Sequence, residues 1–350
     1  MAIASARLGQ TKKHGIAVRH GRSIMHTCIT RRVALAIAAA SIFASPSVAW
    51  AEAWPSRSVT MLLPFASGGG ADLLARVMAQ SFSEQLGQQF IVDNRPGAGG
   101  NIGAAVVAKA APDGYMLLFG TPGPLSNNKL IYKAMPFDPD QAFTPVVLLA
   151  TTPLVIAVRP SLPVKDLKEL AAYGKANPGK LTIGVSGNGT LGHVAGLLLQ
   201  KELGVAMTIV PYRGTSHIIT DLLGSQVDLT VDFLPAFVPL ARDGKVRVLA
   251  VTTDHRSRDL PGVPTVKDEG YPGMEVVGWY ALAAPTGTPP AIIDKLNAAA
   301  NIYLKSPKGQ EALEKLSMEG AGGTPGDMKA FLASELAKWA PVVKAANISL

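Results

Sequence analysis

Three glycine-rich turns, each between a predicted strand and a predicted helix, are the segments best suited to chemistry. They occupy residues 67–70, 97–103 and 186–192. A helix N-terminus offers backbone N–H groups without partners and a partial positive charge, and glycine lets a ligand approach that backbone closely. Glycine also occurs in such loops for structural reasons alone. Three turns of this kind nevertheless favour an anion site, such as one for a carboxylate, and we expect it to use Ser67, Gly69, Gly70 and Gly189.

Polar side chains beside these turns are candidates for direct ligand contact, and each has a structural alternative. Asp72 could accept from a ligand amine or hydroxyl, or it could stabilise its helix start and pair with Arg76. His193 follows Thr190, a suitable N-cap, by three residues. A neutral His193 could donate to a ligand carboxylate, or it could be a half-buried side chain with an internal hydrogen bond.

A second group of candidates follows two later strands. Tyr212 could form a wall of a cleft and Gly214 could present its N–H group, because both lie between a predicted strand and a predicted helix. Arg213, between them, is expected at the surface. Asp232, at the tip of a strand, could face the same cleft, whereas Asp228 within that strand is expected to be structural.

Several kinds of active site are excluded by the residues present. Segment 68–72 lacks the Lys and Ser/Thr of a P-loop, and Ile102 stands where a dinucleotide fingerprint needs its third glycine. Asn188 replaces the last glycine of a GxSxG elbow around Ser186. The single cysteine, Cys28, and the widely spaced histidines provide no metal cluster. The sequence therefore predicts no metal, no cofactor and no catalytic residue.

The positive charge of the chain is concentrated in residues 1–51. The formal net charge is +8, but seven Lys or Arg and no Asp or Glu lie in this segment, which leaves 26 bases against 25 acids. A nucleic-acid-binding protein carries its basic footprint in the folded part. The segment instead has the features of an export signal: Arg31-Arg32 end a basic region, an apolar run covers 33–44, and Ala49-Trp50-Ala51 is a small-x-small cleavage site.

Export predicts a periplasmic protein whose mature chain starts at Glu52. The apolar run is too short to span a bilayer. Cys28 precedes the run, so a lipid anchor is not expected. A start at Met25 would give a signal of ordinary length, and the arginine pair leaves the twin-arginine route open beside the general one.

From Trp54 onward, short apolar strands alternate with amphipathic helices. This order predicts an α/β fold with parallel-rich sheets and helices on both faces. We expect strands at 59–63, 90–92, 115–119, 146–158, 181–185, 208–210, 227–231 and 246–252, with helices between them, one of which ends at Gly87. The chain after residue 252 is expected to be mostly helical, with a last helix capped by Thr324 and Asp327 and kinked or ended by Pro341.

The predicted elements form two α/β units of similar length. The C-terminal helices have no sheet of their own and must pack on one of these units. We therefore expect two lobes, 52–154 with 279–350 and 155–278, with two crossings of the chain between them. Such an arrangement places a ligand cleft at the hinge, lined by the carboxyl ends of strands.

The motifs, in this order, resemble the Bug family of extracytoplasmic solute receptors of tripartite tricarboxylate transporters. The likeness covers about residues 54–340. It rests on the segments 54–57 (WPSR), 64–72 (PFASGGGAD) with Arg76, 94–103 (NRPGAGGNIG), 112–115 (PDGY), 136–139 (PFDP), 186–193 (SGNGTLGH), 211–214 (PYRG), 244–250 (GKVRVLA) and 278–280 (GWY). Three residues depart from the family pattern: Ser67, Ala71 and Arg213. Ala71 lacks the hydroxyl that is common there, so the resemblance assigns no particular ligand.

The resemblance implies a two-lobed periplasmic binding protein fold of the type II kind and a receptor rather than an enzyme. It implies that the first glycine-rich loop and the 186–190 loop grip a ligand carboxylate, partly through waters, which can bridge nearly as well as direct bonds. The expected ligand is a small organic acid or amino acid, and the receptor is expected to be a monomer. The implied contact residues are Phe65, Ser67, Gly69, Gly70, Asp72, Thr121, Ser186, Gly189, Thr190, His193, Tyr212, Gly214 and Asp232.

Three functions remain open at this point. The leading one is delivery of the ligand to a membrane permease. The second is docking on a periplasmic sensor kinase, which the sequence does not separate from uptake. The third, a remote one, is a secreted hydrolase that uses Ser186 with His193 or His217.

Overall fold

The computed structural model describes residues 54–346 and 349. The predicted export segment, residues 1–51 with Cys28, lies outside the described residues. Ala53–Leu350 forms one compact unit. Within the described residues, no helix combines the length and the apolar character that crossing a membrane requires.

The elements follow the alternation that the sequence predicts. The strands are β1 (Val59–Leu63), β2 (Phe90–Asn94), β3 (Met116–Gly120), β4 (Phe143–Val158), β5 (Thr182–Val185), β6 (Thr208–Pro211), β7 (Leu229–Phe233), β8 (Arg247–Val251), β9 (Val277–Pro285) and β10 (Glu319–Gly322). The α-helices are α2 (Gly70–Leu86), α3 (Asn101–Ala108), α4 (Asn128–Ile131), α5 (Pro139–Ala142), α6 (Leu167–Ala176), α7 (Leu191–Leu203), α8 (Thr215–Leu223), α9 (Val238–Arg242), α10 (Pro290–Lys305), α11 (Pro307–Lys315) and α12 (Pro325–Ala346). Short turns η1 (Ala98–Gly100), η2 (Gly123–Asn127), η3 (Leu234–Ala236) and η4 (Pro272–Met274) complete the described chain.

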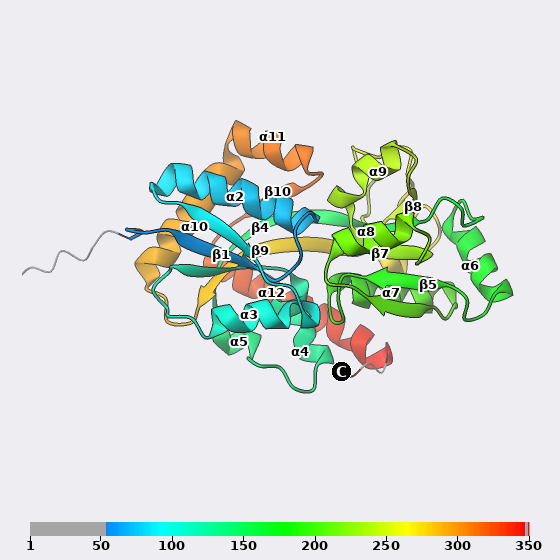
Figure 1. Cartoon of the computed structure of the whole chain (residues 1–350), viewed down its shortest axis with the longest axis horizontal. Helices are drawn as coiled ribbons and strands as arrows, with labels where there is room; N and C mark the ends of the chain where they lie inside the picture. The colour runs from blue at the N-terminus through cyan, green and yellow to red at the C-terminus, as the bar shows by residue number, and fades with distance from the viewer. Residues whose placement is uncertain (1–53, 347–348, 350) are drawn as a thin grey trace, which may run out of the picture. The chain divides into compact units, whose positions relative to one another are not determined.

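The described strands form one sheet in the order β2-β1-β3-β9-β4-β7-β5-β6, with β8 and β10 also paired to β4. The first strand group, β1 to β3 with β9, β10 and the first part of β4, carries α2 and α3 on opposite faces (Figure 1). The second strand group comprises β5 to β8 and the end of β4. Each group contains parallel strands, whereas β4 and β9 run antiparallel to their neighbours.

Strand β4 joins the two groups. It pairs with β9 from Phe143 to Pro153 and with β7 from Leu154 onward. The chain crosses back to the first group between β8 and β9. Thr252, in this crossing segment, forms hydrogen bonds that hold it against β4. Its fully buried hydroxyl accepts from Leu154 N at 2.9 Å and donates to Val276 O at 2.6 Å. One side chain therefore connects both crossing segments.

Helix ends obey the local signals of the sequence. Gly87 ends α2 in the left-handed conformation, with φ of 75°, and Gly204 ends α7 in the same way, with φ of 63°. The Thr190 hydroxyl caps α7 by accepting from His193 N. Thr324 and Asp327 cap each other's backbone N–H groups at the start of α12. The predicted helix stop at Gly87 and the predicted caps at Thr190, Thr324 and Asp327 are confirmed.

Most of the regular structure after residue 252 is helical, as predicted, but the prediction missed two strands. The segment after residue 252 contains β9 and β10, and β9 is a central, almost wholly buried strand. Its sequence, VGWYALAAP, is a continuous apolar run, and periodicity alone does not separate such a strand from a buried helix. Of the two outcomes predicted at Pro341, a kink or an end, the end is wrong, because α12 continues through Pro341 to Ala346. Trp339 and Val343, on either side of Pro341, are buried in the core of the second strand group.

Helix α12 is fixed to the sheet by one buried carboxylate. Glu335 Oε2 accepts from Trp279 Nε1 of β9 at 2.9 Å and from Trp339 Nε1 of α12 at 3.2 Å. Both indoles are at most 1% exposed. Earlier on the same helix, Met328 packs in the core around Trp279. Because Trp339 packs with the second group, α12 spans both strand groups.

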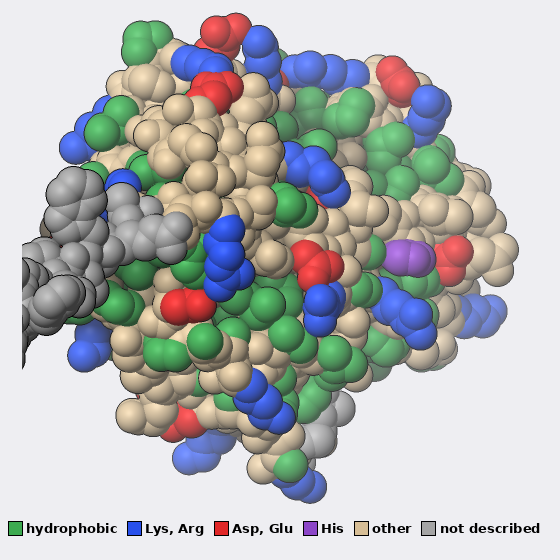
Figure 2. All heavy atoms as spheres, turned by 60° about the vertical axis from the view of Figure 1, so that its left-hand side comes forward, with side chains coloured by type: hydrophobic (Ala, Val, Ile, Leu, Met, Phe, Trp, Pro, Cys, Tyr) green, Lys and Arg blue, Asp and Glu red, His purple; other side chains and the backbone are tan. Residues whose placement is uncertain are grey.

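On the face shown in Figure 2, Lys and Arg side chains are scattered among Asp and Glu rather than gathered into one patch. This distribution agrees with the near balance of charges after residue 51. The described part of this face therefore lacks the basic footprint of a nucleic-acid-binding surface.

Glu335→Ala is expected to lower the free energy of unfolding by about 2–4 kcal/mol, because it leaves two buried indole N–H groups without an acceptor. Glu335→Gln, which keeps one acceptor oxygen, should cost clearly less. Glu311→Ala, on the exposed side of α11, should change stability by no more than about 0.5 kcal/mol. Urea unfolding of the three variants measures this order, and equal effects of Glu335→Ala and Glu311→Ala would contradict it.

Candidate functional site

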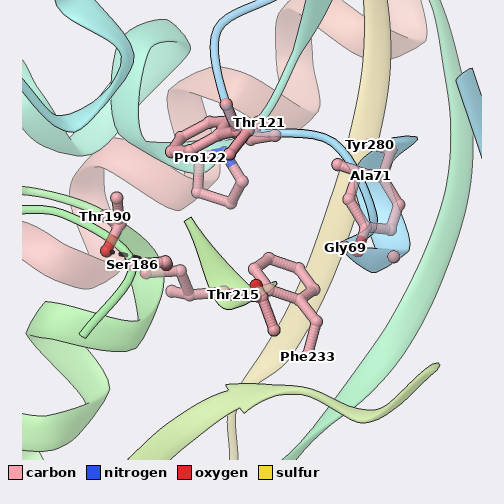
Figure 3. A pocket seen from close by; sticks show the side chains of 13 residues that line it. Gly69, Ala71, Thr121, Pro122, Ser186, Thr190, Thr215, Phe233 and Tyr280 are labelled. Carbon is pink, nitrogen blue, oxygen red and sulfur yellow. Dashed lines mark hydrogen bonds between the residues drawn. The ribbon is translucent and has the colours of Figure 1, made fainter. Parts of the chain in front are cut away.

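A small cavity lies where the carboxyl ends of β1, β3, β5 and β7 meet. Its volume is about 30 Å³, which is enough for at least one water molecule. Residues from both strand groups line it (Figure 3). We call it the inner cavity; its lining residues are Phe65, Ala66, Gly69, Gly70, Ala71, Thr121, Pro122, Ser186, Thr190, Leu191, Thr215, Phe233 and Tyr280.

Three helices begin at the inner cavity. Its lining includes Gly70, Leu191 and Thr215, which are the first residues of α2, α7 and α8. The N–H groups of the first turn have no partner inside a helix, and the helix dipoles place partial positive charge there. No Lys or Arg is among the lining residues. The inner cavity is thus suited to an anion held by backbone groups rather than by a cation.

Hydroxyl groups supply the remaining polarity of the inner cavity. Thr190 Oγ1 donates to Gly187 O at 2.7 Å and lies 3.5 Å from Ser186 Oγ. Thr215 Oγ1 donates to Asp232 Oδ2 at 2.9 Å. The hydroxyls of Thr121 and Tyr280 are buried and have no partner among the described residues. These two groups remain available to whatever occupies the inner cavity.

Asp72 braces the first glycine-rich turn instead of lining the inner cavity. Its carboxylate accepts from Gly68 N at 3.1 Å, from two Arg76 nitrogens at 3.0 Å and from Asn94 Nδ2 at 3.1 Å. Burial alone would raise the pKa of Asp72, but the hydrogen bonds from Arg76, Gly68 and Asn94 lower it below its ordinary value. This is the structural alternative that the sequence left open.

His193 and Gly189 are partners of each other. Gly189 N donates to His193 Nδ1 at 3.0 Å, so this N–H group is already used. Burial lowers the pKa of His193 and keeps the ring neutral. Within the described chain, Ser186 forms no hydrogen bond to a histidine; the bond of its hydroxyl is to Thr190. The geometry therefore contains no serine–histidine pair for hydrolysis.

Asp232 is connected to the inner cavity through Thr215, which is one of the lining residues. Asp232 is fully buried and accepts only from Thr215 Oγ1 and, at 2.8 Å, from Phe233 N. Burial raises its pKa to about 6, although these two hydrogen bonds oppose the rise. Asp72 and Asp232 are thus two buried carboxyls whose surroundings shift their pKa values in opposite directions.

Tyr212 and Gly214 lie on the outer side of the site. Tyr212 donates to Asp221 Oδ2 at 2.7 Å, and burial together with this bond raises its pKa to about 12. Gly214 caps α8, and a Cβ there would stand 3.2 Å from Ala66 N. Ser67 is exposed and does not line the inner cavity. Of the sequence-derived candidates, the inner cavity brings together Phe65, Gly69, Gly70, Thr121, Ser186 and Thr190.

A second, outer cavity of about 440 Å³ adjoins the first. The two share Phe65 and Ser186, and the outer one is also lined by the 96–100 turn, Ile102, Tyr212 and Arg213. The glycine-rich turns of the two strand groups meet beside it. Tyr132 Oη donates to Asn188 O at 2.9 Å, and a Cβ on Gly187 would stand 3.0 Å from Gly99 Cα. Glycine at these positions allows the two backbones to touch.

Sequence reasoning missed several lining residues. Thr215 and Leu191 are the first residues of helices that were predicted, so the predicted helix starts could have indicated them. Phe233 directly follows the predicted candidate Asp232. Tyr280 belongs to β9, which was not predicted as a strand; the motif 278–280 (GWY) marked it as part of the family pattern but did not place its side chain at the site.

The fold is that of the periplasmic binding proteins, because solved structures of that class match it along nearly their whole length. Residues 74–348 match the sequence model of the "Tripartite tricarboxylate transporter family receptor". The chain belongs to this family, the Bug receptors, which bind solutes and are not enzymes. The resemblance seen in the motifs is confirmed.

Relatives cover nearly the whole described chain. Protein BugT of Bordetella pertussis is 35% identical over 319 residues, 91% of this chain and 97% of BugT. The solved structure of R. palustris Rpa4515 with adipate is 42% identical, with a TM-score of 0.83, and covers 85% of this chain and 100% of its own. MatC (Rpa3494) from Rhodopseudomonas palustris, solved with bound malate, is 35% identical with a TM-score of 0.80, over 83% and 100% of the two chains.

Asp232→Asn and Asp72→Asn should have opposite pH dependences of stability. The raised pKa of Asp232 means that its ionisation costs stability as pH rises from about 4 to about 6. The difference in unfolding free energy between Asp232→Asn and the parent should therefore become more favourable by about 2–3 kcal/mol from pH 4 to pH 7.

The lowered pKa of Asp72 has the reverse consequence. Its ionised form contributes stability above its ordinary pKa, and this contribution is lost as pH falls. Asp72→Asn should thus be most destabilising at neutral pH and least destabilising near pH 3. Denaturant titrations at several pH values measure both trends. If the stability of the two variants relative to the parent changed with pH in the same direction, the pKa values of Asp72 and Asp232 would not be shifted in opposite directions.

Proposed function

We propose that this protein is a periplasmic receptor that captures a small organic acid or amino acid by a carboxylate and delivers it to the membrane permease of a tripartite tricarboxylate transporter. The observation that carries the proposal is the meeting of three helix N-termini at a hydroxyl-lined cavity with no Lys or Arg in its lining. Backbone N–H groups and helix dipoles stabilise a carboxylate without the desolvation of a buried cation.

We further propose that residues 52–154 with 279–350 and residues 155–278 act as two lobes that close on the ligand. The supporting contacts are those between the 97–100 and 187–189 turns and the bond from Tyr132 to Asn188. The crossings at β4 and between β8 and β9 would be the hinge. In the conformation described, the inner cavity has room for about one carboxylate, and the rest of a ligand would extend past Phe65 into the outer cavity.

The ligand class follows from the site and from the relatives. A backbone-lined inner cavity recognises one carboxylate, while the larger outer cavity leaves the remainder of the ligand less restricted. Rpa4515 was solved with adipate and MatC with malate. We therefore propose short aliphatic acids with one or two carboxylates as the first compounds to test.

The protein should bind such an acid reversibly and compact on binding. Titration calorimetry against malate, adipate, succinate and glutamate measures affinity, and small-angle scattering measures closure. Gly70→Val should weaken binding at least tenfold, about 1.4 kcal/mol. A Cβ on Gly70 would stand 3.1 Å from Tyr280 Oη and 3.3 Å from Pro235 Cβ, so the added side chain would fill the inner cavity or hold the turns apart.

Gly262→Val is the matched control, because a Cβ at Gly262 meets nothing within 4 Å. It should bind with the affinity of the parent. A folded Gly70→Val variant with unchanged affinity would remove the start of α2 from the site. Mass spectrometry of the acid after long incubation should recover it unchanged, and conversion that Ser186→Ala abolishes would refute the receptor in favour of a hydrolase.

We propose that residues 1–51 direct export and are removed before Glu52. The support is the basic region with Arg31-Arg32, the apolar run at 33–44 and the small-x-small site. Intact-mass analysis of the protein from a periplasmic fraction should give a chain that starts within a few residues of Glu52. A periplasmic protein that retains 25–51 would show that the signal is not cleaved there.

A further inference from the structure

The side chain of Tyr280 is the buried polar group at the inner cavity that the proposed function has not yet used. Tyr280 lies in the middle of β9 and is 1% exposed. Its ring packs against the rings of Phe119 and Phe233, with centroids 6.0 Å and 5.2 Å away. These two contacts restrict the direction of the ring, and therefore the position of its hydroxyl.

Tyr280 lines the inner cavity, and its hydroxyl is buried beside the start of α2. Tyr280 Oη has no hydrogen bond to any described residue. It lies against the start of α2, because a Cβ on Gly70 would stand 3.1 Å from it. Tyr280 lies on one side of the inner cavity, and Ser186 and Thr190 lie on the other (Figure 3). A buried hydroxyl without a partner costs free energy, so a group that arrives with an acceptor is favoured there.

Among the described residues, none accepts a hydrogen bond from the Tyr280 hydroxyl. The negative charge of Asp232 acts on Tyr280. However, Asp232 accepts from Thr215 Oγ1 and Phe233 N and forms no hydrogen bond with Tyr280. Burial, with this charge, raises the pKa of Tyr280 well above its ordinary value, so the phenol keeps its proton. Tyr280 is therefore available as a hydrogen-bond donor at neutral pH.

From this geometry we infer that Tyr280 is a specificity-determining residue whose hydroxyl donates a hydrogen bond to an oxygen of the ligand carboxylate in the inner cavity. The inference rests on the proposed function. It adds a side-chain donor from β9 to the N–H groups of α2, α7 and α8, and Thr121, whose hydroxyl is also buried without a partner, lies in the same lining. Donors to a charged oxygen are stronger than those to a neutral one, so this bond favours the ionised acid over an uncharged analogue.

Tyr280→Phe tests the inference, because it removes the hydroxyl and keeps the ring against Phe119 and Phe233. Titration calorimetry with malate, adipate, succinate and glutamate should show about ten- to a hundredfold weaker binding of each acid that the parent binds. The unfolding temperature of the ligand-free variant should be unchanged or higher, because a buried hydroxyl without a partner is lost. A merely structural tyrosine would show the opposite pattern, a lower unfolding temperature.

Tyr303→Phe is the matched control. Tyr303 is a buried tyrosine of α10 that packs in the first strand group and is absent from the lining of the inner cavity. This control should keep the affinity of the parent. A second comparison uses an acid that binds and its primary amide, and Tyr280→Phe should reduce the preference of the parent for the acid.

The outcomes separate the two proposals. Failure of the parent to bind any of the acids overturns the proposed function, and the inference falls with it. Binding by the parent with equal affinity in Tyr280→Phe overturns the role of Tyr280 alone. A lower unfolding temperature of Tyr280→Phe also overturns it, because the hydroxyl then has a partner within the protein.

Discussion

The central feature of the structure is the meeting of three helix N-termini at one cavity. The strand groups, the glycine-rich turns and the crossing segments together hold these N-termini in place. The first residues of α2, α7 and α8 belong to different strand groups yet line the same inner cavity. Unpaired N–H groups lose hydration when they are buried, so they are stable there only with an anion or water against them. A site of this kind needs no cation, which agrees with the absence of Lys and Arg from its lining.

Two buried carboxyl groups near the inner cavity, those of Asp72 and Asp232, differ in charge state because their surroundings shift their pKa values in opposite directions. Asp72 has four hydrogen bonds and holds the first glycine-rich turn in shape, and it stays ionised. Asp232 has two hydrogen bonds and no cation, so burial dominates its pKa. A negative charge on Asp232, one hydrogen bond away from the lining residue Thr215, would oppose an anion in the inner cavity, and this opposition would fall as the carboxyl protonates near pH 6. The fold therefore couples the start of α8, through Thr215, to a group that titrates close to neutral pH.

Two chain segments connect the strand groups, β4 and the segment between β8 and β9, and hydrogen bonds join them to each other. β4 changes partners between Pro153 and Leu154, and the Thr252 hydroxyl links Leu154 with Val276 at the same place. Away from this point, α12 packs on both groups through Trp279 and Trp339, which share the Glu335 carboxylate. The glycine-rich turns of the two groups touch beside the outer cavity.

Local signals in the sequence determined the α/β order, the helix caps at Thr190 and Thr324, the glycine stops and the glycine-rich turns, because each depends on residues within a few positions of one another. The motif order also identified the family. The tertiary structure decided which candidates meet: it placed Ser186 and Thr190 in the inner cavity, turned Asp72 toward Arg76 and used the Gly189 N–H for His193. It also made β9 a central strand and brought Tyr280 to the site, because an apolar run of nine residues carries no periodicity that assigns it to a strand. Only pairing with β3 and β4, from distant parts of the chain, fixes that strand and the direction of its side chains.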